Sequence, residues 1–206
     1  LSQAVPEKVI ACGFDTTTVF AISHLSDEGY RVYVEVFGGG YGASVHQDGS
    51  DALDSPLSNC SNTPVEALDM EYDYFRVVEY GLRPDSGGAG EYRGGLGYNR
   101  AYEITRDNVT FATYSDRFTI APDGIFGGQD GMTGRCQVLR GGEVIPLHSK
   151  ASMDLQKGDV LSIHVGGGGG YGDPAKRART AIEQDIDDGL ISPEAAHRDY
   201  PAIAAE

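Results

Sequence analysis

The sequence predicts an α+β fold that is predominantly β, with glycine-rich loops and a short C-terminal helical tail. Short segments rich in β-branched and aromatic residues recur along most of the chain, and clusters of glycine separate them. Helical patterns gather only near the end. We therefore expect a glycine-rich β domain over residues 1–174 and a helical segment over residues 175–206.

The strand predictions follow from alternation of apolar and polar side chains. Residues 31–37 alternate, with Val32, Val34 and Val36 on one face. Similar segments, each bounded by Gly, Asp, Asn or Pro, are residues 74–80, 98–104, 109–114, 135–139 and 160–165. The run Arg-Gly-Gly-Glu at 140–143 predicts a hairpin turn.

Helix signals are concentrated after residue 172. Asp173 followed by Pro174 is typical of an N-cap and first turn, and Gly189 is expected to end that helix. Ser192 and Pro193 repeat the pattern for a short helix that ends near Tyr200. A weaker pattern predicts another helix around residues 5–13.

Composition and charge exclude several functional classes. The hydrophobic fraction of 40% in 206 residues is enough for a core. The balance of 16 basic and 31 acidic residues gives a formal charge of -15, which argues against nucleic acid or an anionic membrane as a partner. No apolar stretch approaches the roughly 20 residues that span a bilayer.

The cysteines and the N-terminus bear on cellular context. Cys12, Cys60 and Cys136 form no CxxC pair, so neither a zinc site nor a disulfide framework is predicted. Reduced cysteines indicate a cytoplasmic protein. No signal peptide opens the chain. Because the chain begins at Leu1 without an initiator methionine, we expect a trimmed, processed or split portion of something longer.

The 29 glycines, about twice the usual share of about 7%, invite a nucleotide-binding interpretation. Residues 38–43 fit GxGxxA after a strand, but the turn residues at 44–53 do not open the helix that would hold a pyrophosphate. The run at 166–170 lacks the following Lys-Ser or Lys-Thr of a Walker loop. These glycines are expected to let the backbone pass close to a ligand or to another chain.

The sequence also contains one candidate nucleophile and one candidate metal-binding pair, and each lacks part of its motif. Ser86 lies among glycines but lacks the Gly-x-Ser-x-Gly elbow, and a turn serine that bonds its own backbone is the stronger interpretation. His46 and Asp48 are close in sequence, but no further ligand pattern completes a metal site. No metal site is therefore predicted in this chain.

Residues 83–97 form the most informative cluster. Successive backbone amides in glycine-rich turns can form an anion-binding nest, and Arg83 and Arg93 could add contacts to a carboxylate or phosphate. The alternative is that these arginines pair with nearby carboxylates of the same chain.

The same cluster resembles the C-terminal part of the hydantoinase B/oxoprolinase family. The resemblance rests on ordered matches along nearly the whole chain, at residues 39–43, 48–49, 62–66, 82–90, 92–97, 116–117, 127–131, 157–159 and 167–177. Such long ordered matches are far more specific than any single glycine motif.

The resemblance implies an enzyme with several subunits. Family members include ATP-dependent hydantoinases, 5-oxoprolinases, caprolactamases and acetone and acetophenone carboxylases. In these enzymes ATP is held by a hydantoinase A-like ATPase subunit, which phosphorylates the substrate carbonyl or enol, and a divalent metal is held in the N-terminal portion of the B-type subunit. ATP and the metal are thus expected outside this chain, and its expected partners are the ATPase subunit, that N-terminal portion and a small-molecule substrate.

The resemblance also selects candidate site residues. A labile phosphorylated intermediate must be shielded from water, and preorganised amides can stabilise negative charge. The candidate catalytic residues are Asp85, Ser86, Arg93, Asp116 and Arg117. The candidate substrate-binding residues are Asn62, Gly87, Gly88, Gly94 and Gly95.

Three functional hypotheses remain open at this point. The chain could be a subunit or C-terminal fragment of an ATP-dependent hydrolase that opens hydantoin, oxoproline or a lactam, and that is inactive alone. It could instead belong to a ketone carboxylase of the acetone or acetophenone type. It could also be a non-catalytic structural subunit of such a complex.

Overall fold

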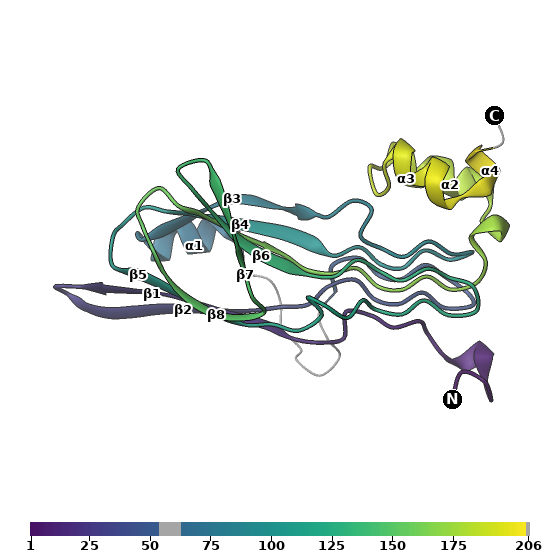
Figure 1. The fold of residues 1–206 in the computed structure, drawn as a ribbon, viewed down its shortest axis with the longest axis horizontal. Coiled ribbons are helices and arrows are strands. Elements are labelled where there is room, and N and C mark those ends of the chain that lie inside the picture. Colours follow the sequence, from purple (N-terminus) through teal and green to yellow (C-terminus); the bar gives the residue numbers. More distant parts are fainter. Residues whose placement is uncertain (54–62, 205–206) are drawn as a thin grey trace.

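The computed structural model of this chain describes residues 1–53 and 63–204, and it consists mainly of two antiparallel sheets. Figure 1 shows the sheets as facing layers at one end of an elongated molecule, a bundle of long extended segments in the middle, and a helical tail at the other end. The predicted fold class, α+β and predominantly β, is confirmed.

The first sheet has four strands in the order β2-β1-β5-β8. Its strands are β1 (Thr18–Ser26), β2 (Gly29–Phe37), β5 (Val109–Tyr114) and β8 (Lys150–Leu155). The second sheet has five strands in the order β3-β4-β9-β6-β7. Its strands are β3 (Phe75–Leu82), β4 (Tyr98–Ile104), β6 (Arg135–Arg140), β7 (Glu143–Leu147) and β9 (Val160–His164).

All six predicted strands are present, each within two residues of the expected bounds. The predicted hairpin turn joins β6 to β7, where Gly141 and Gly142 have φ of 58° and 90°, a conformation that glycine adopts without strain. Strands β1, β7 and β8 and helix α1 (Val65–Glu71) were not predicted from the sequence. The predicted helix at 5–13 is wrong: only a 3₁₀ turn, η1 (Pro6–Lys8), forms, and the chain is extended after it.

Aromatic side chains fill the core between the two sheets. Phe20 lies at its centre and makes ring contacts with Tyr33, Phe37, Tyr102 and Phe111, with centroids 5.0–6.2 Å apart. Offset and edge-to-face pairs of this kind add about 0.5–1.5 kcal/mol each beyond the burial of their area.

One buried ion pair crosses the core. Arg100 on β4 is fully buried, and its Nη1 lies 2.5 Å from Oε1 of Glu35 on β2. The hydroxyls of Tyr33 and Tyr102 donate to the other oxygen of Glu35. Because the two partners belong to different sheets, this network ties the two layers together.

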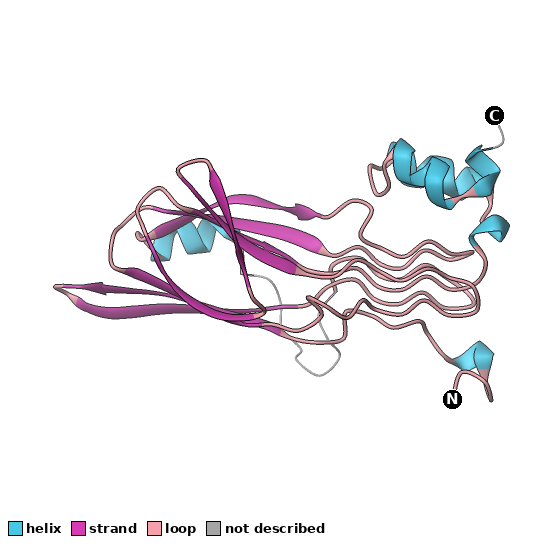
Figure 2. Ribbon diagram, in the orientation of Figure 1, coloured by secondary structure: helices cyan, strands magenta, loops and turns pink. Residues whose placement is uncertain are grey.

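The glycine-rich segments form an ordered bundle and not flexible loops (Figure 2). The central segment is residues 166–172, and its successive amides point to different neighbours. Every third amide donates to the same neighbouring segment. Gly167 and Gly170 donate to the segment of residues 129–132, at the carbonyls of Met132 and Gln129. Gly168 and Tyr171 donate to the segment of residues 92–95, at the carbonyls of Gly95 and Tyr92, and Gly169 donates to Cys12. This repeat is that of a polyproline II-type helix, which has three residues per turn and no internal hydrogen bonds.

Close packing of these segments requires glycine. A Cβ placed on Gly168 would lie 2.0 Å from the carbonyl oxygen of Tyr41, and one on Gly40 would lie 1.9 Å from that of Gly95. Both obstacles are backbone atoms, which cannot rotate away. The glycine clusters therefore serve contacts within this chain, where the sequence had suggested a ligand or another chain.

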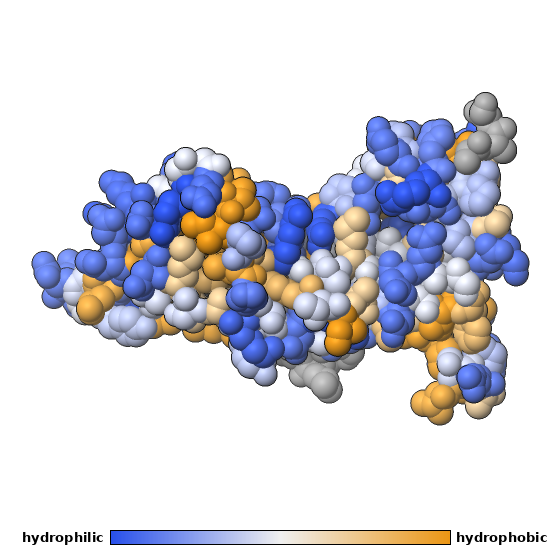
Figure 3. Space-filling model, in the orientation of Figure 1, coloured by the Kyte–Doolittle hydropathy of each residue, from blue (hydrophilic) through white to orange (hydrophobic). Residues whose placement is uncertain are grey.

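The tail contains η2 (Pro174–Lys176), α2 (Arg179–Asp187), α3 (Pro193–Asp199) and α4 (Pro201–Ala204). Asp173 caps η2, Gly189 follows α2 with φ of 70°, and Ser192 caps α3, so these three signals are confirmed. The single helix expected between Asp173 and Gly189 is wrong: Arg177 and Ala178, with ψ of 130° and 132°, interrupt it between η2 and α2. Ile182, Ile191 and Tyr200 form a small separate core against Ala89 of the bundle. The outer surface of the tail is mostly hydrophilic (Figure 3).

Candidate functional site

The structure places the candidate residues in two separate regions. Asp85, Ser86, Arg93 and the four glycines Gly87, Gly88, Gly94 and Gly95 belong to the bundle, beside the helical tail. Asp116 and Arg117 follow β5, where the four-stranded sheet meets the bundle. Asn62 lies outside the described residues.

Ser86 makes the contacts of a structural turn residue. Its side chain is fully buried, its hydroxyl donates to the carbonyl of Arg83 at 2.6 Å, and it accepts from the amide of Gly97 at 2.9 Å. These bonds match the turn-serine interpretation of the sequence. A catalytic role for Ser86 stays a prediction.

The amides of three of the four candidate glycines are paired within the chain. Gly88 donates to Gly168 at 2.8 Å, Gly94 to Gly88 at 2.9 Å and Gly95 to Tyr41 at 2.8 Å. A Cβ on Gly87 would lie 2.0 Å from the carbonyl oxygen of Gly94. An anion nest would need free amides, and these three are already bonded, so substrate binding by the glycines stays a prediction.

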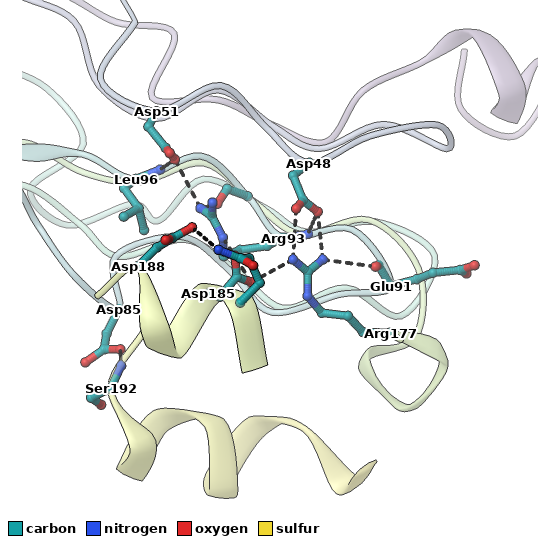
Figure 4. A network of polar contacts seen from close by, with 12 residues as sticks. Asp48, Asp51, Asp85, Glu91, Arg93, Leu96, Arg177, Asp185, Asp188 and Ser192 are labelled. Carbon is teal, nitrogen blue, oxygen red and sulfur yellow. Dashed lines mark hydrogen bonds and ion pairs between the residues drawn. The ribbon is translucent and has the colours of Figure 1, made fainter. Parts of the chain in front are cut away.

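Arg93 and Arg177 form a buried ionic network that joins the tail to the bundle (Figure 4). Arg177 contacts both oxygens of Asp48, at 2.7 and 2.8 Å, and Asp185 of α2 at 2.6 Å. Arg93 lies 3.1 Å from Asp51 and 3.6 Å from Asp185. Arg93 thus pairs with carboxylates of its own chain, which was the alternative interpretation from the sequence.

The network shifts the titration of its members. Burial alone would raise the pKa of Asp48, but the hydrogen bonds and charge of Arg177 and the amide of Arg93 hold that pKa below its ordinary value. Burial opposes the charged form of Arg177, yet Asp48 and Asp185 raise its pKa above the usual arginine value. Asp85 makes a separate contact with the tail: its carboxylate accepts a hydrogen bond from the amide of Ser192, at the start of α3, at 2.7 Å.

Asp116 and Arg117 line an open pocket of about 300 Å³ at the end of β5. Its lining residues are Thr16, Asp116, Arg117, Phe118, Thr119, Ile120, Ser149 and Lys150. Lys150 on β8 lies 3.1 Å from Asp116. We call this group the junction pocket.

Arg117 has an unusual backbone conformation and few polar contacts among the described residues, and a catalytic role for it stays a prediction. Its φ of 56° is unusual for a residue with a side chain, and such strain clusters at functional sites. Its guanidinium donates only to the carbonyls of Phe14 and Ala121, at 3.4 and 3.3 Å, and no ion pair joins it to a carboxylate anywhere in residues 1–53 and 63–204. With Lys150, it places two cations beside one carboxylate.

Sequence reasoning missed the other polar residues of the junction pocket. Lys150, Ser149 and Thr16 come from segments far from Asp116 in the chain, and no local motif marks them. They could have been found only from the pairing of β8 with β5, which places Lys150 opposite Tyr114.

Metal ligation and membrane insertion find no support in the part of the chain that is described. Across residues 1–53 and 63–204, no group of three or more His, Cys, Asp or Glu side chains could hold a metal ion. Within the same ranges, no helix is long and apolar enough to cross a membrane.

Comparisons with known sequences give one family. The model of the family described as "Hydantoinase B/oxoprolinase" matches residues 1–174. An uncharacterized protein of Methanocaldococcus jannaschii is 40% identical over 176 residues, which are 85% of this chain and 31% of that protein. The putative B-type subunit of a D-/L-hydantoinase from a Pseudomonas species is 34% identical over 203 residues, which are 97% of this chain and 34% of that protein. The chain thus spans about a third of these two relatives.

Solved structures give the same fold. An acetone carboxylase has a TM-score of 0.78 and 17% identity, with 97% of this chain and 31% of that chain covered. The ATP-dependent caprolactamase of Pseudomonas jessenii has a TM-score of 0.74 and 24% identity, with 97% and 36% covered.

Proposed function

The chain belongs to the hydantoinase B/oxoprolinase family, and from that premise we propose that it is part of an ATP-dependent enzyme that opens a cyclic amide. The observation that carries this proposal is the family match over residues 1–174, together with two relatives at 33–34% identity, one named as the B-type subunit of a hydantoinase and the other as a 5-oxoprolinase. The substrate would be a hydantoin, 5-oxoproline or a lactam.

The names of two relatives support the proposal that this chain has partner polypeptides. One is named as the B-type subunit of a hydantoinase and another as the beta subunit of a caprolactamase, which supports assembly with further polypeptides. We propose a hydantoinase A-like ATPase subunit and the N-terminal portion of a B-type subunit as these partners. The complex would be cytoplasmic, in keeping with the free thiols of Cys12 and Cys136.

ATP, bound by the partner, would transfer its γ-phosphoryl group to the amide carbonyl oxygen of the substrate, with ADP as the leaving group. Addition of water to the activated carbon would then break the ring C–N bond and release phosphate. A divalent metal would also be held outside this chain, in the N-terminal portion of the B-type sequence. In this chain, Arg117 and Lys150 of the junction pocket would bind the negative charge of the substrate or of its activated form. Asp116 would orient Lys150 through their ion pair at 3.1 Å.

The test is turnover by the reconstituted complex of this chain, the ATPase subunit and the N-terminal B-type portion. We expect ATP hydrolysis coupled to ring opening with hydantoin, 5-oxoproline or caprolactam. Bicarbonate-dependent carboxylation of acetone or acetophenone, with no ring opening, would instead assign the complex to the ketone carboxylases.

Arg117→Met and Lys150→Met test the role of the junction pocket. Each is expected to lower kcat/KM about 100-fold or more, because electrostatic stabilisation by one group typically contributes that much. Arg76→Met is the matched control, because Arg76 is an exposed, ion-paired arginine on β3. Full turnover by both pocket variants would refute the proposed role of the junction pocket.

Asp85→Ala and Arg93→Ala test the candidates of the bundle. Both side chains contact the helical tail, so their loss of activity must be compared with their loss of stability. An effect on kcat that persists in a variant with normal unfolding behaviour would support a catalytic role.

A further inference from the structure

The outer face of the four-stranded sheet is apolar, although it points away from the core. Strand register places Tyr30, Val32, Val34 and Val36 of β2 on this face, beside Val19, Ala21, Ser23 and Leu25 of β1. The next strand, β5, continues it with Thr110, Ala112 and Tyr114. We call these residues the outer sheet face.

The inner face of the same strand shows why this pattern is unusual. On β2, the side chains of Tyr33, Glu35 and Phe37 are buried in the core, whereas Val32 and Val34 remain 40% and 57% exposed. An antiparallel sheet that is solvated on one side normally carries polar residues there. A strand with apolar side chains on both faces is typical of a sheet that is covered on both sides.

The exposed side chains are large and lie side by side. Tyr30 is 67% exposed, Leu25 is 60% exposed and Tyr114 is 61% exposed, and Leu25 pairs directly with Tyr30 across the strands. No charged residue occupies an outward position on β1, β2 or β5, and the charges lie on the edge strand β8, at Lys150 and Asp154. An apolar centre with a polar rim is the composition of a protein interface.

No helix within residues 1–53 and 63–204 packs on this face. Helix α1 packs beside β3, and α2–α4 lie at the opposite end of the molecule (Figure 1). Strand β2 is also the terminal strand of its sheet, and a long apolar edge strand is normally covered in a stable assembly.

The outer sheet face is continuous with the junction pocket. The ammonium group of Lys150 lies 4.4 Å from the centre of the Tyr114 ring and 3.1 Å from Asp116. A polypeptide seated on Tyr114 would therefore reach the open side of the pocket that Asp116, Arg117 and Lys150 line.

We propose that the outer sheet face docks the remaining part of the hydantoinase B-type sequence, and that this docking completes the wall of the junction pocket. The relatives carry the matched region in polypeptides of which it is only 31% and 34%, so each has further chain to cover such a face. The occupant would present an uncharged, apolar surface, because the centre of the outer sheet face has no charge to pair. This proposal rests on the proposed function for the identity of the partner.

Tyrosine labelling in the assembled complex tests the interface directly. Hydroxyl-radical footprinting reports the solvent exposure of each tyrosine, and it can be applied to the intact complex. The chain therefore does not have to be prepared alone. We expect Tyr30 and Tyr114 to react about tenfold more slowly than their exposure in the free chain predicts, because the partner excludes solvent from them. Rates that match exposures of 67% and 61% would overturn the proposal.

A paired substitution identifies the occupant. Val34→Lys with Tyr114→Lys should abolish co-elution of the remaining B-type portion while the chain stays folded, because charge on this face leaves an unpaired cation in an apolar contact. Leu139→Lys with Val144→Lys is the matched control: this neighbouring pair on the five-stranded sheet is 40% and 53% exposed and should leave co-elution unchanged.

Two further results would contradict the proposal. Equal co-elution of both double variants would show that the portion binds elsewhere, and sedimentation showing that the face joins two copies of this chain would assign it to a homodimer. The amide-hydrolysis assay is separate from these readouts. If the complex carboxylated a ketone while Tyr30 and Tyr114 were protected, the proposed function would be refuted and the proposed interface would still be supported.

Discussion

At the scale of single residues, glycine and arginine have sharply defined roles in this chain. The glycines allow backbone segments to touch, and the buried arginines hold segments together through paired carboxylates. The sequence suggested that the glycines face a ligand or another chain, and it left open whether Arg83 and Arg93 bind an anion or pair with carboxylates of this chain. In the structure the bundle glycines pack on this chain's own backbone, and Arg93 pairs with its carboxylates.

Gly168→Ala tests the packing of the bundle. The new methyl group would lie 2.0 Å from the carbonyl oxygen of Tyr41, so we expect a loss of at least about 3 kcal/mol in the free energy of unfolding, or failure to fold. Gly81→Ala is the control, because a Cβ at that position would have no atom within 4 Å and its φ is not positive. Urea unfolding of the two variants measures the difference, and similar midpoints would refute the role of Gly168.

Arg177→Met tests the ionic network. Removing the guanidinium takes from Asp48 the only cation paired with it among the described residues, and leaves Asp185 with Arg93 alone, at 3.6 Å. Breaking a fully buried pair costs about 3–5 kcal/mol, but the side chain of Asp48 is 35% exposed and Asp185 keeps Arg93, so we expect a loss of about 2–3 kcal/mol. Arg198→Met removes an exposed pair with Asp199 and should change stability by only about 0–1 kcal/mol. Chemical denaturation would contradict the network's role if the two losses were equal.

At the scale of elements, the helical tail depends on charges in the bundle. Arg177 in the tail binds Asp48, and Ser192 at the start of α3 donates to Asp85. The small apolar core around Ile182 adds packing against Ala89. The attachment is therefore partly ionic and should respond to pH.

We expect the tail to loosen in acid. Burial raises the pKa of Asp48, but Arg177 and the amide of Arg93 lower it further than burial raises it, so the folded pKa lies below the unfolded value of about 3.9. The stabilising contribution is therefore complete above that value and is lost as the pH falls through the folded pKa.

Hydrogen exchange of residues 174–204 as a function of pH measures this effect, after correction for the intrinsic exchange rate. Protection of the tail should decrease at the acid end, while the strands of the five-stranded sheet stay protected. Asp48→Asn is expected to weaken the tail at neutral pH and to reduce its additional loss in acid. An unchanged acid response in that variant would rule out Asp48 as the cause.

At the scale of the whole molecule, two sheets and a bundle share one continuous chain. The Arg100–Glu35 pair connects the sheets, and residues 165–172 run directly from β9 into the centre of the bundle. The core, the bundle and the junction pocket are therefore expected to be structurally coupled.

Arg100→Met tests the connection between the sheets. It leaves Glu35 buried without its cation, so we expect a loss of about 3–5 kcal/mol. The double variant Arg100→Met with Glu35→Leu should lose less, because no unpaired charge remains in the core, although Tyr33 and Tyr102 lose an acceptor. A double-mutant cycle by calorimetry measures the coupling, and simple additivity would exclude it.

The sequence by itself determined the fold class, six strands, the hairpin at 140–143, the caps of the tail and the family. These features depend on local chemistry, because alternation, turn glycines and Asp-Pro or Ser-Pro pairs act within a few residues. The ordered motifs at 82–97 carried the family resemblance for the same reason.

Only the tertiary structure decided where the glycines and charges point. A glycine that faces a ligand and one that faces a neighbouring backbone have the same local sequence, and the distance from Gly168 to Tyr41 depends on segments more than a hundred residues apart. The same holds for Val32, Val34 and Val36: alternation placed them on one face, but only the packing of Tyr33 and Phe37 into the core showed that this face points outward. The junction pocket likewise exists only because β8 pairs with β5 and brings Lys150 to Asp116.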